Sequence, residues 1–245
     1  MWFQFPRLGW SRSGRPPRSY GMSSRRMKIR GTPAAVTMLC AVGMALVAQY
    51  SRAAEGRVNI VAFGDSLTAG YGLPANEAFP AQLQRALDAK GLAANVVNAG
   101  VSGDTTTGGL SRLDWSVPDG TDAVILELGA NDALRGIAPG ITRKALDTML
   151  RRLKERKIPV LLCGMVAPPN LGAEFGWAFN AIYADLAAQY GVILYPFFLT
   201  GVAADPKLNQ RDGLHPTAAG VAVIVDRILP QVEQLIARAK ASHVP

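Results

Sequence analysis

A serine, an aspartate and a histidine that could form a hydrolytic triad lie in two short segments far apart in the sequence. Ser66 belongs to the segment GDSL, and Asp212 and His215 belong to the segment DGLHP. A serine hydroxyl becomes a useful nucleophile when an imidazole accepts its proton, and a carboxylate can fix the tautomer of that imidazole. The chain has only two histidines, and His243 lies in the C-terminal tail. His215 is therefore the candidate base.

The elements that must position these side chains are predicted to be alternating strands and helices. Five short runs are apolar nearly throughout, which is typical of strands buried on both faces of a sheet. They are Asn59–Phe63, Asn95–Asn98, Ala123–Leu128, Val160–Gly164 and Val192–Tyr195. Amphipathic patterns and terminal Pro or Gly residues predict helices between and after them. These are Pro80–Lys90, Ile141–Arg156, Phe175–Tyr190 and Thr217–Lys240, and Pro230 should kink or split the last one.

This alternation predicts one α/β domain from about Val58 to Lys240, a three-layer α/β/α sandwich around a five-stranded parallel sheet. Ligands of such sheets bind outside the carboxyl ends of the strands. Polar, glycine-rich loops follow the first three strands there, over Gly64–Gly72, Ala99–Gly109 and Gly129–Gly136. His215 lies in the loop that leads into the last helix. We therefore expect Ser66 and His215 to meet at this edge.

The charge distribution argues against a nucleic-acid-binding protein. The formal net charge is +8, but nine of the 26 basic residues lie in residues 1–54, which contain no acid. The rest of the chain is close to neutral, with 17 basic and 18 acidic residues. A folded domain of this composition has no broad basic surface for a phosphate backbone.

Residues 1–54 have the layout of a secretory signal peptide. A basic leader precedes the apolar stretch 34–48, and small residues follow near Ala53 and Ala54, where cleavage is expected. This predicts a secreted protein, located in the periplasm, with residues 55–245 as a single hydrolase domain. The apolar stretch is shorter than the roughly 20 residues of a membrane span. The alternative is an uncleaved leader, which would be the only contact with a membrane. Met22 or Met27 would each give a more ordinary start.

Four segments together resemble the SGNH hydrolases, also called the GDSL esterase and lipase superfamily. They are GDSL at 64–67, NAGVSGDT at 98–105, GAND at 129–132 and DGLH at 212–215, in this order and on the predicted loops. The longer strings GDSLTAGYG (64–72) and ELGAND (127–132) are most similar to the secreted bacterial acyl-CoA thioesterase I, lysophospholipase and arylesterase group. The resemblance covers nearly the whole chain after the leader.

The resemblance implies the flavodoxin-like SGNH fold, no cofactor, and an acyl-enzyme formed on Ser66. In this family the serine attacks an ester or thioester carbonyl, the histidine carries its proton, and the aspartate orients the histidine. Those roles fall on Ser66, His215 and Asp212. The oxyanion hole would consist of the backbone N–H groups of Ser66 and Gly103 and the side-chain amide of Asn131. A small-molecule ester or thioester is the implied partner.

Structural roles remain open for several of these residues. Ser66 could instead be a helix N-cap, His215 a plain loop residue, and Asn131 a turn residue. Asp65 and Asp132 are expected to bond loop backbone.

Two further residues are expected to be structural. Glu127, a charge within a buried strand, should be paired or hydrogen-bonded. Cys163 is expected to pack rather than react. No cluster of residues has the spacing of metal ligands, so no metal site is predicted.

The substrate wall is predicted in two places. One is the turn that contains Tyr71 and Leu73, and the other is the loop from Met165 to Trp177, in particular Pro169 and Asn170. Val166 and Ala167 stand where the thioesterase-like relatives tend to carry Arg-Leu, so the resemblance does not assign their acyl-chain preference to this chain.

The most direct function is a serine esterase or thioesterase acting on aryl esters, acyl-CoA or lysophospholipid-like substrates. One alternative is a carbohydrate O-deacetylase of the same superfamily. The other, from a different class, is a non-catalytic binding module on the same scaffold. Loss of at least one of Ser66, Gly103, Asn131, Asp212 and His215 would be expected in a decayed site, and all five are present.

Overall fold

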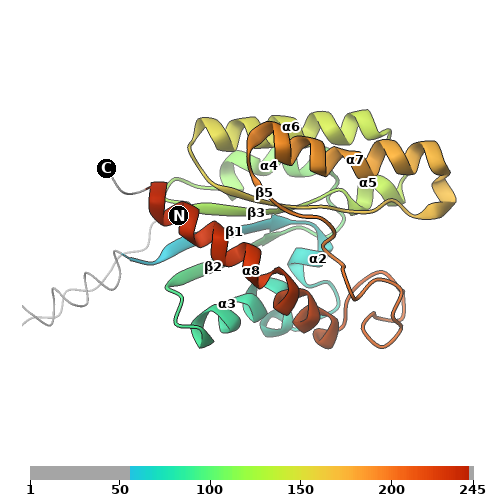
Figure 1. Cartoon of the computed structure of the whole chain (residues 1–245). Coiled ribbons are helices and arrows are strands. Elements are labelled where there is room, and N and C mark those ends of the chain that lie inside the picture. Colours follow the sequence, from blue (N-terminus) through green and yellow to red (C-terminus); the bar gives the residue numbers. More distant parts are fainter. Residues whose placement is uncertain (1–55, 243–245) are drawn as a thin grey trace, which may run out of the picture. The chain divides into compact units, whose positions relative to one another are not determined.

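The computed structural model of the protein describes residues 56–242, and these residues form a five-stranded parallel sheet with helices on its faces (Figure 1). The strands are β1 (Val58–Gly64), β2 (Ala94–Gly100), β3 (Ala123–Glu127), β4 (Val160–Cys163) and β5 (Ile193–Tyr195). Their order across the sheet is β2-β1-β3-β4-β5, and every neighbouring pair is parallel. This is the flavodoxin-like order, and it confirms the predicted fold class.

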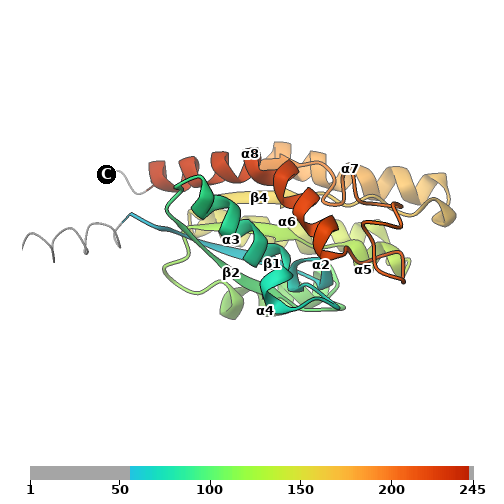
Figure 2. The same ribbon diagram turned by 90° about the horizontal axis from the view of Figure 1, so that it is seen from below.

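Helices cover both faces of the sheet. The longer helices are α3 (Phe79–Ala89), α4 (Thr106–Ser116), α6 (Pro139–Glu155), α7 (Ala173–Tyr190) and α8 (Ala218–Ser242). The short ones are α2 (Ser66–Ala69), α5 (Ala130–Leu134) and the 3₁₀ turns η1 (Ala75–Glu77) and η2 (Pro169–Leu171). Helices α3 and α8 pack together on one face, and α4, α6 and α7 pack on the other (Figures 1 and 2). The predicted three layers are therefore present.

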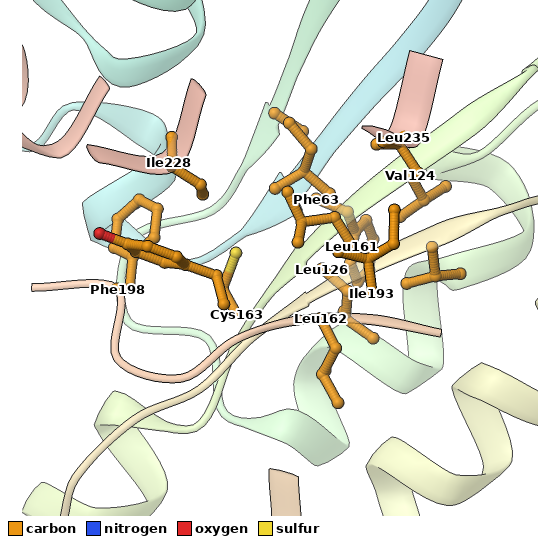
Figure 3. Close-up of a cluster of buried hydrophobic side chains, with 14 of the residues drawn as sticks. Phe63, Val124, Leu126, Leu161, Leu162, Cys163, Ile193, Phe198, Ile228 and Leu235 are labelled. Atoms are coloured by element: carbon orange, nitrogen blue, oxygen red, sulfur yellow. The ribbon is translucent and has the colours of Figure 1, made fainter. Parts of the chain in front are cut away.

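The core lies between the central strands and these helices. All five residues of β3 and all four of β4 are buried, as their continuous apolar sequences predict. Figure 3 shows Val124, Leu126 and Leu161 grouped with Leu235 of α8. Burying a side chain of this size stabilises the fold by roughly 1.5–3 kcal/mol. Cys163 is also fully buried in this cluster, as expected, and burial raises the pKa of its thiol.

Strand β2 differs from the prediction that all five strands are buried on both faces. It is an edge strand that pairs only with β1, and most of its residues are exposed or half-buried. Val97 is 54% exposed. Apolar composition did not reveal this, because edge position depends on the order of strands in the sheet.

All three glycine-rich segments that were predicted as loops contain helical residues, and α2 lies within Gly64–Gly72. Helix α4 begins at Thr106, within the predicted loop Ala99–Gly109, because the Thr105 side chain accepts a hydrogen bond from the N–H of Gly108 and caps the helix. Gly109 then allows close packing, since a Cβ there would lie 2.4 Å from Leu128. Helix α5 begins at Ala130, within the predicted loop Gly129–Gly136.

Helix α8 continues through Pro230 and does not split there. Its axis bends part-way along, which Figure 2 shows clearly. A proline within a helix removes one hydrogen-bond donor and crowds the preceding turn, and this accounts for a bend.

The predicted leader, including the apolar stretch 34–48 and the cleavage site, lies outside the described residues, as does His243. Among the helices of residues 56–242, none combines the length and the apolar character needed to cross a bilayer.

Candidate active site

Ser66 occupies the sharp junction where β1 ends and α2 begins. It is the first residue of α2, and the N-cap is Asp65, whose Oδ1 accepts a hydrogen bond of 3.0 Å from the N–H of Leu67. The capping role that the sequence left open for Ser66 therefore belongs to Asp65. As the first residue of a helix, Ser66 has a backbone N–H without an acceptor inside that helix. Its hydroxyl is free for a partner from another segment.

That partner is His215. The Nε2 atom of His215 lies 2.9 Å from Ser66 Oγ, and its Nδ1 atom lies 2.7 Å from Asp212 Oδ2. The structure thus brings together the three side chains of the two distant segments, in the order hydroxyl, imidazole, carboxylate. With Nδ1–H donating to Asp212, Nε2 can accept the serine proton.

Asp212 is held in its ionised form by the loop that carries it. The backbone N–H groups of His215 and Leu214 donate to its Oδ1 at 3.0 and 2.9 Å, and the His215 ring donates to Oδ2. These donors lower the pKa of Asp212 to about 2. The group therefore stays a carboxylate across the neutral range and can stabilise a protonated imidazole.

Gln210 ties the histidine loop to the loop after α2. Its backbone N–H donates to the carbonyl of His215 at 2.7 Å, and its side-chain amide donates to the carbonyls of Tyr71 and Pro216 at 2.7 and 3.0 Å. The Tyr71 ring in turn lies 4.6 Å from the His215 ring, centroid to centroid. The His215 ring is thus held by Asp212 of its own loop and by Tyr71 of the loop after α2.

The predicted oxyanion-hole residues lie at the ends of β2 and β3. Gly103 has φ +86°, a conformation that favours glycine, and its carbonyl accepts a hydrogen bond of 2.9 Å from Arg135. Asn131 Nδ2 donates to the carbonyl of Asp104 at 2.9 Å and to Asp65 Oδ2 at 3.1 Å. Asn131 lines the same cavity as Ser66 and His215. Its amide is therefore a structural link as well as a candidate donor.

Two buried carboxyl groups lie beneath the serine. Burial raises the pKa of Asp65 to about 6, although hydrogen bonds from Leu67 and Asn131 lower it. Burial and the neighbouring Asp65 charge raise the pKa of Glu127 well above its ordinary value. Thr68 Oγ1 donates to Glu127 Oε2 at 2.7 Å, so Glu127 is hydrogen-bonded as predicted. Its other oxygen, Oε1, is buried and has no partner within residues 56–242.

Asp132 links three helices. Its Oδ2 accepts from the backbone N–H of Thr106, as expected for a residue that bonds loop backbone. Its Oδ1 accepts from the hydroxyls of Thr106 and Thr142, on α4 and α6. This residue of α5 therefore fixes the segment that carries Asn131.

Arg112, a buried arginine on α4 that joins the strand ends, was not predicted from the sequence. Its Nε pairs with Asp104 Oδ2 at 2.6 Å, and its two terminal nitrogens donate to the carbonyls of Ala99 and Gly64, both at 2.8 Å. The guanidinium also lies 4.1 Å from the centre of the Phe63 ring. A planar fork with five donors suits such a junction. Arg112 lies beyond the predicted loop Ala99–Gly109 and outside every predicted strand and helix, so no local pattern indicated this role.

A cavity of about 370 Å³ opens beside Ser66, Asn131 and His215. Its walls are mostly apolar and come from α5, the loop after β4 and the loop between β5 and α8. They include Met165, Val166, Pro168, Phe197, Leu199, Ala203 and Leu214. An apolar cavity with a few convergent polar groups at one end suits an acyl group whose carbonyl is held at the serine.

The predicted substrate wall is only partly the wall of this cavity. Met165, Val166 and Pro168 line it, as the proposed loop suggested, but Leu73, Pro169 and Asn170 do not. Tyr71 instead packs on the His215 ring. Leu73 packs against the core, and the turn η2 carries Pro169 and Asn170 past the cavity. Within residues 56–242, no three His, Cys, Asp or Glu side chains lie close enough to hold a metal ion.

Comparison with known proteins agrees with this geometry. The model of the GDSL-like lipase/acylhydrolase family matches residues 62–223. The chain belongs to this family. It is 38% identical over 194 residues to esterase TesA of Pseudomonas aeruginosa, covering 79% of this chain and 96% of that protein. It is also 38% identical to thioesterase 1/protease 1/lysophospholipase L1 of Escherichia coli, covering 72% of this chain and 84% of that protein.

A solved structure gives the same result. AlinE4, an SGNH-hydrolase family esterase, is 49% identical and superposes with a TM-score of 0.62, covering 73% of this chain and 96% of that chain. The four sequence segments and the fold therefore agree with the family. This acylhydrolase is a serine esterase or thioesterase that acts on a small-molecule ester or thioester.

The first prediction concerns the Arg112 junction. Arg112→Met removes the arginine donor to Asp104 and to two carbonyls, and breaking a buried ion pair of this kind costs about 3–5 kcal/mol of unfolding free energy. Arg152→Met is the matched control, because Arg152 pairs with Asp114 in an exposed bridge worth about 1 kcal/mol or less. Urea unfolding measures both. Equal losses in the two variants would contradict the role of Arg112.

The second prediction concerns the pH dependence of stability. An unfolded glutamate titrates near pH ~4.3, whereas folded Glu127 keeps its proton to higher pH. The folded state then binds more protons than the unfolded state, so the free energy of unfolding falls as pH rises above that value. Glu127→Gln cannot titrate. We expect the wild type to lose stability relative to this variant as the pH rises above about 5, by at most about 1.4 kcal/mol per pH unit.

The control for this pH series is Glu155→Gln, which alters an exposed pair with Arg151. Its stability should follow the wild type across the same pH range. Parallel curves for the wild type and Glu127→Gln would mean that Glu127 is already ionised in the folded protein.

Proposed function

We propose that the protein hydrolyses carboxylic esters and acyl thioesters through an acyl-enzyme on Ser66. The observation that carries this proposal is the chain of contacts from Ser66 Oγ to His215 Nε2 at 2.9 Å and from His215 Nδ1 to Asp212 at 2.7 Å. These distances allow direct proton transfer from the hydroxyl to the ring. The ionised state of Asp212 supports the role of stabilising the protonated ring.

In the first half of the reaction, Ser66 Oγ attacks the carbonyl carbon while His215 Nε2 takes the hydroxyl proton. The carbonyl oxygen becomes an oxyanion. When the tetrahedral intermediate collapses, the bond to the leaving group breaks and His215 gives its proton to the departing alkoxide or thiolate. In the second half, His215 removes a proton from water, which attacks the acyl-enzyme, and then returns that proton to Ser66. The products are a carboxylic acid and an alcohol or thiol.

The oxyanion is proposed to be held by the N–H groups of Ser66 and Gly103 and by the Asn131 amide. Both N–H bonds of that amide already have acceptors, Asp104 O and Asp65 Oδ2. The longer of the two contacts, to Asp65, is the one we expect the oxyanion to replace.

The proposed substrates follow from the cavity. Its mostly apolar walls suit the hydrocarbon chain of an acyl group, and they favour aryl esters, acyl-CoA and lysophospholipid-like substrates over acetylated carbohydrate. The name of the Escherichia coli relative includes both thioesterase and lysophospholipase activity. A non-catalytic binding module would not require the Ser66, His215 and Asp212 contacts.

We further propose that residues 55–245 act as a single hydrolase domain after secretion to the periplasm. The support is the sequence of residues 1–54, with its basic leader, short apolar stretch and small residues near Ala53 and Ala54.

Replacing the nucleophile tests the mechanism. Ser66→Ala removes the attacking oxygen, and we expect kcat for p-nitrophenyl butanoate to fall by about 10⁴- to 10⁶-fold. The same variant should not react with a fluorophosphonate probe that labels the wild type. Circular dichroism and thermal unfolding should show an intact fold. Labelling of the variant, or hydrolysis at a wild-type rate, would refute the assignment.

Removing the side-chain oxyanion donor gives a graded effect. We expect Asn131→Ala to lower kcat for the same ester by about 10²- to 10³-fold, because one donor to the oxyanion is lost. The KM should change much less, since the donor acts mainly in the transition state. Thermal unfolding reports the separate cost of leaving Asp65 without this partner. A kcat within a few fold of the wild type would exclude Asn131 from the oxyanion hole.

A further inference from the structure

A second groove adjoins the cavity at the serine. It is lined by the start of α7 and by the segment that precedes it, has a volume of about 370 Å³, and shares one wall residue, Pro168, with the serine cavity. Helix α7 begins at the same end of the sheet as α2 and α5 (Figure 1). The groove and the serine cavity are therefore neighbours that meet at Pro168.

The surface of this groove is uncharged and open. Its lining includes Pro168, Pro169, Gly172, Gly176 and Trp177, and none of its lining residues is charged. A Cβ at Gly172 or Gly176 would meet no atom within 4 Å. Packing therefore gives no reason for a glycine at 176, where glycine costs a helix roughly 0.5–1 kcal/mol relative to alanine. The two glycines leave the groove free of side chains.

Trp177 forms an exposed wall beside Gly176. It is 76% exposed, so the fold buries little of its large apolar ring. Exposed aromatic rings next to a ligand cavity are typical of binding surfaces. Val166, which lines the serine cavity and is 48% exposed, extends the apolar surface at the cavity mouth.

The groove is fixed in shape before any ligand arrives. The N–H of Ala167 donates to Asn180 Oδ1 at 2.9 Å, which fastens the loop after β4 to α7 on the far side of the groove. The loop after β4 and helix α7, which form the two sides of the groove, are thus joined by a hydrogen bond as well as by packing. A preformed groove binds a flexible chain without the added cost of ordering the protein.

We propose that this groove is a distal acyl subsite that takes the far methylenes of a long acyl chain after they pass Pro168. The inference rests on the proposed function, because it takes the acyl carbonyl to lie at Ser66. The apolar serine cavity holds the first part of the chain, and the ring of Trp177 covers the last part. The protein then prefers long-chain over short-chain esters by virtue of α7.

Two variants change the groove in opposite ways. Trp177→Ala removes a wall, and Gly176→Leu fills the floor, where a leucine also suits a helix better than glycine. For each, kcat/KM is measured with p-nitrophenyl butanoate and p-nitrophenyl dodecanoate, both below their aggregation limits. We expect the dodecanoate-to-butanoate ratio to fall about tenfold in both variants, because contacts to several methylenes are lost.

Matched controls come from elsewhere in the chain. Trp115→Ala alters a tryptophan of α4 that is 72% exposed, and Gly140→Leu alters a helical glycine in α6 whose Cβ would also meet open space. Neither control lies in the groove, so the ratio should stay at the wild-type value in both. A general defect in folding or in the serine site would lower both esters together and leave the ratio unchanged.

The outcomes separate the subsite from the mechanism. An unchanged ratio in Trp177→Ala and Gly176→Leu overturns the subsite, even when both esters are still hydrolysed. A failure of the proposed function appears instead as wild-type protein that hydrolyses neither ester. An unchanged ratio together with a change in oligomeric state, measured by sedimentation, would assign Trp177 to a contact between copies of the chain and would also overturn the subsite.

Discussion

The site depends on one long-range contact, the hydrogen bond that joins the loop before α8 to the start of α2. Gln210 holds the histidine loop against the turn that follows the serine, and this keeps His215 within reach of Ser66. One glutamine side chain bonds the carbonyls of Tyr71 and Pro216, and its backbone bonds the carbonyl of His215. These hydrogen bonds restrict the conformations of a long loop and so fix the position of the His215 imidazole. The triad geometry is thus a property of this loop junction rather than of any single segment.

The surroundings of the serine show how a polar site can lie at the end of a buried strand. Asp65 caps α2 and links it to Asn131, while Glu127 bonds Thr68 beneath them. Burial raises the pKa of both carboxyl groups, so the fold favours their neutral forms over their charged ones. Arg112 satisfies the strand-end carbonyls from the other side. A half-satisfied network of this kind would be costly, and the nearly complete one here holds the catalytic loops in register.

Chemistry and substrate choice share some elements of the fold and not others. The nucleophile, its base and the candidate oxyanion donors lie on the segments after β1, β2 and β3 and before α8. The apolar surfaces come in part from α5 and the loop before α8, but also from the loop after β4 and the beginning of α7. Because β4 carries no catalytic side chain, its loop and α7 can vary without disturbing proton transfer. This division is typical of folds that serve many substrates with one reaction.

The sequence by itself determined the reaction and the architecture. Continuous apolar runs and helical periods depend on local residue types, so five strands, four long helices and the segments with Ser66, Asn131, Asp212 and His215 were readable directly. Arg112, Gln210, the exposed edge of β2 and the walls of the cavity were not, because each depends on which segments become neighbours in space. Tyr71, Leu73, Pro169 and Asn170 were placed near the substrate by loop position alone. Other side chains line the cavity at Ser66, whereas Pro169 lines the second groove. Local sequence patterns determine whether a segment forms a strand, a helix or a loop. Only tertiary packing decides which of its side chains face the active site.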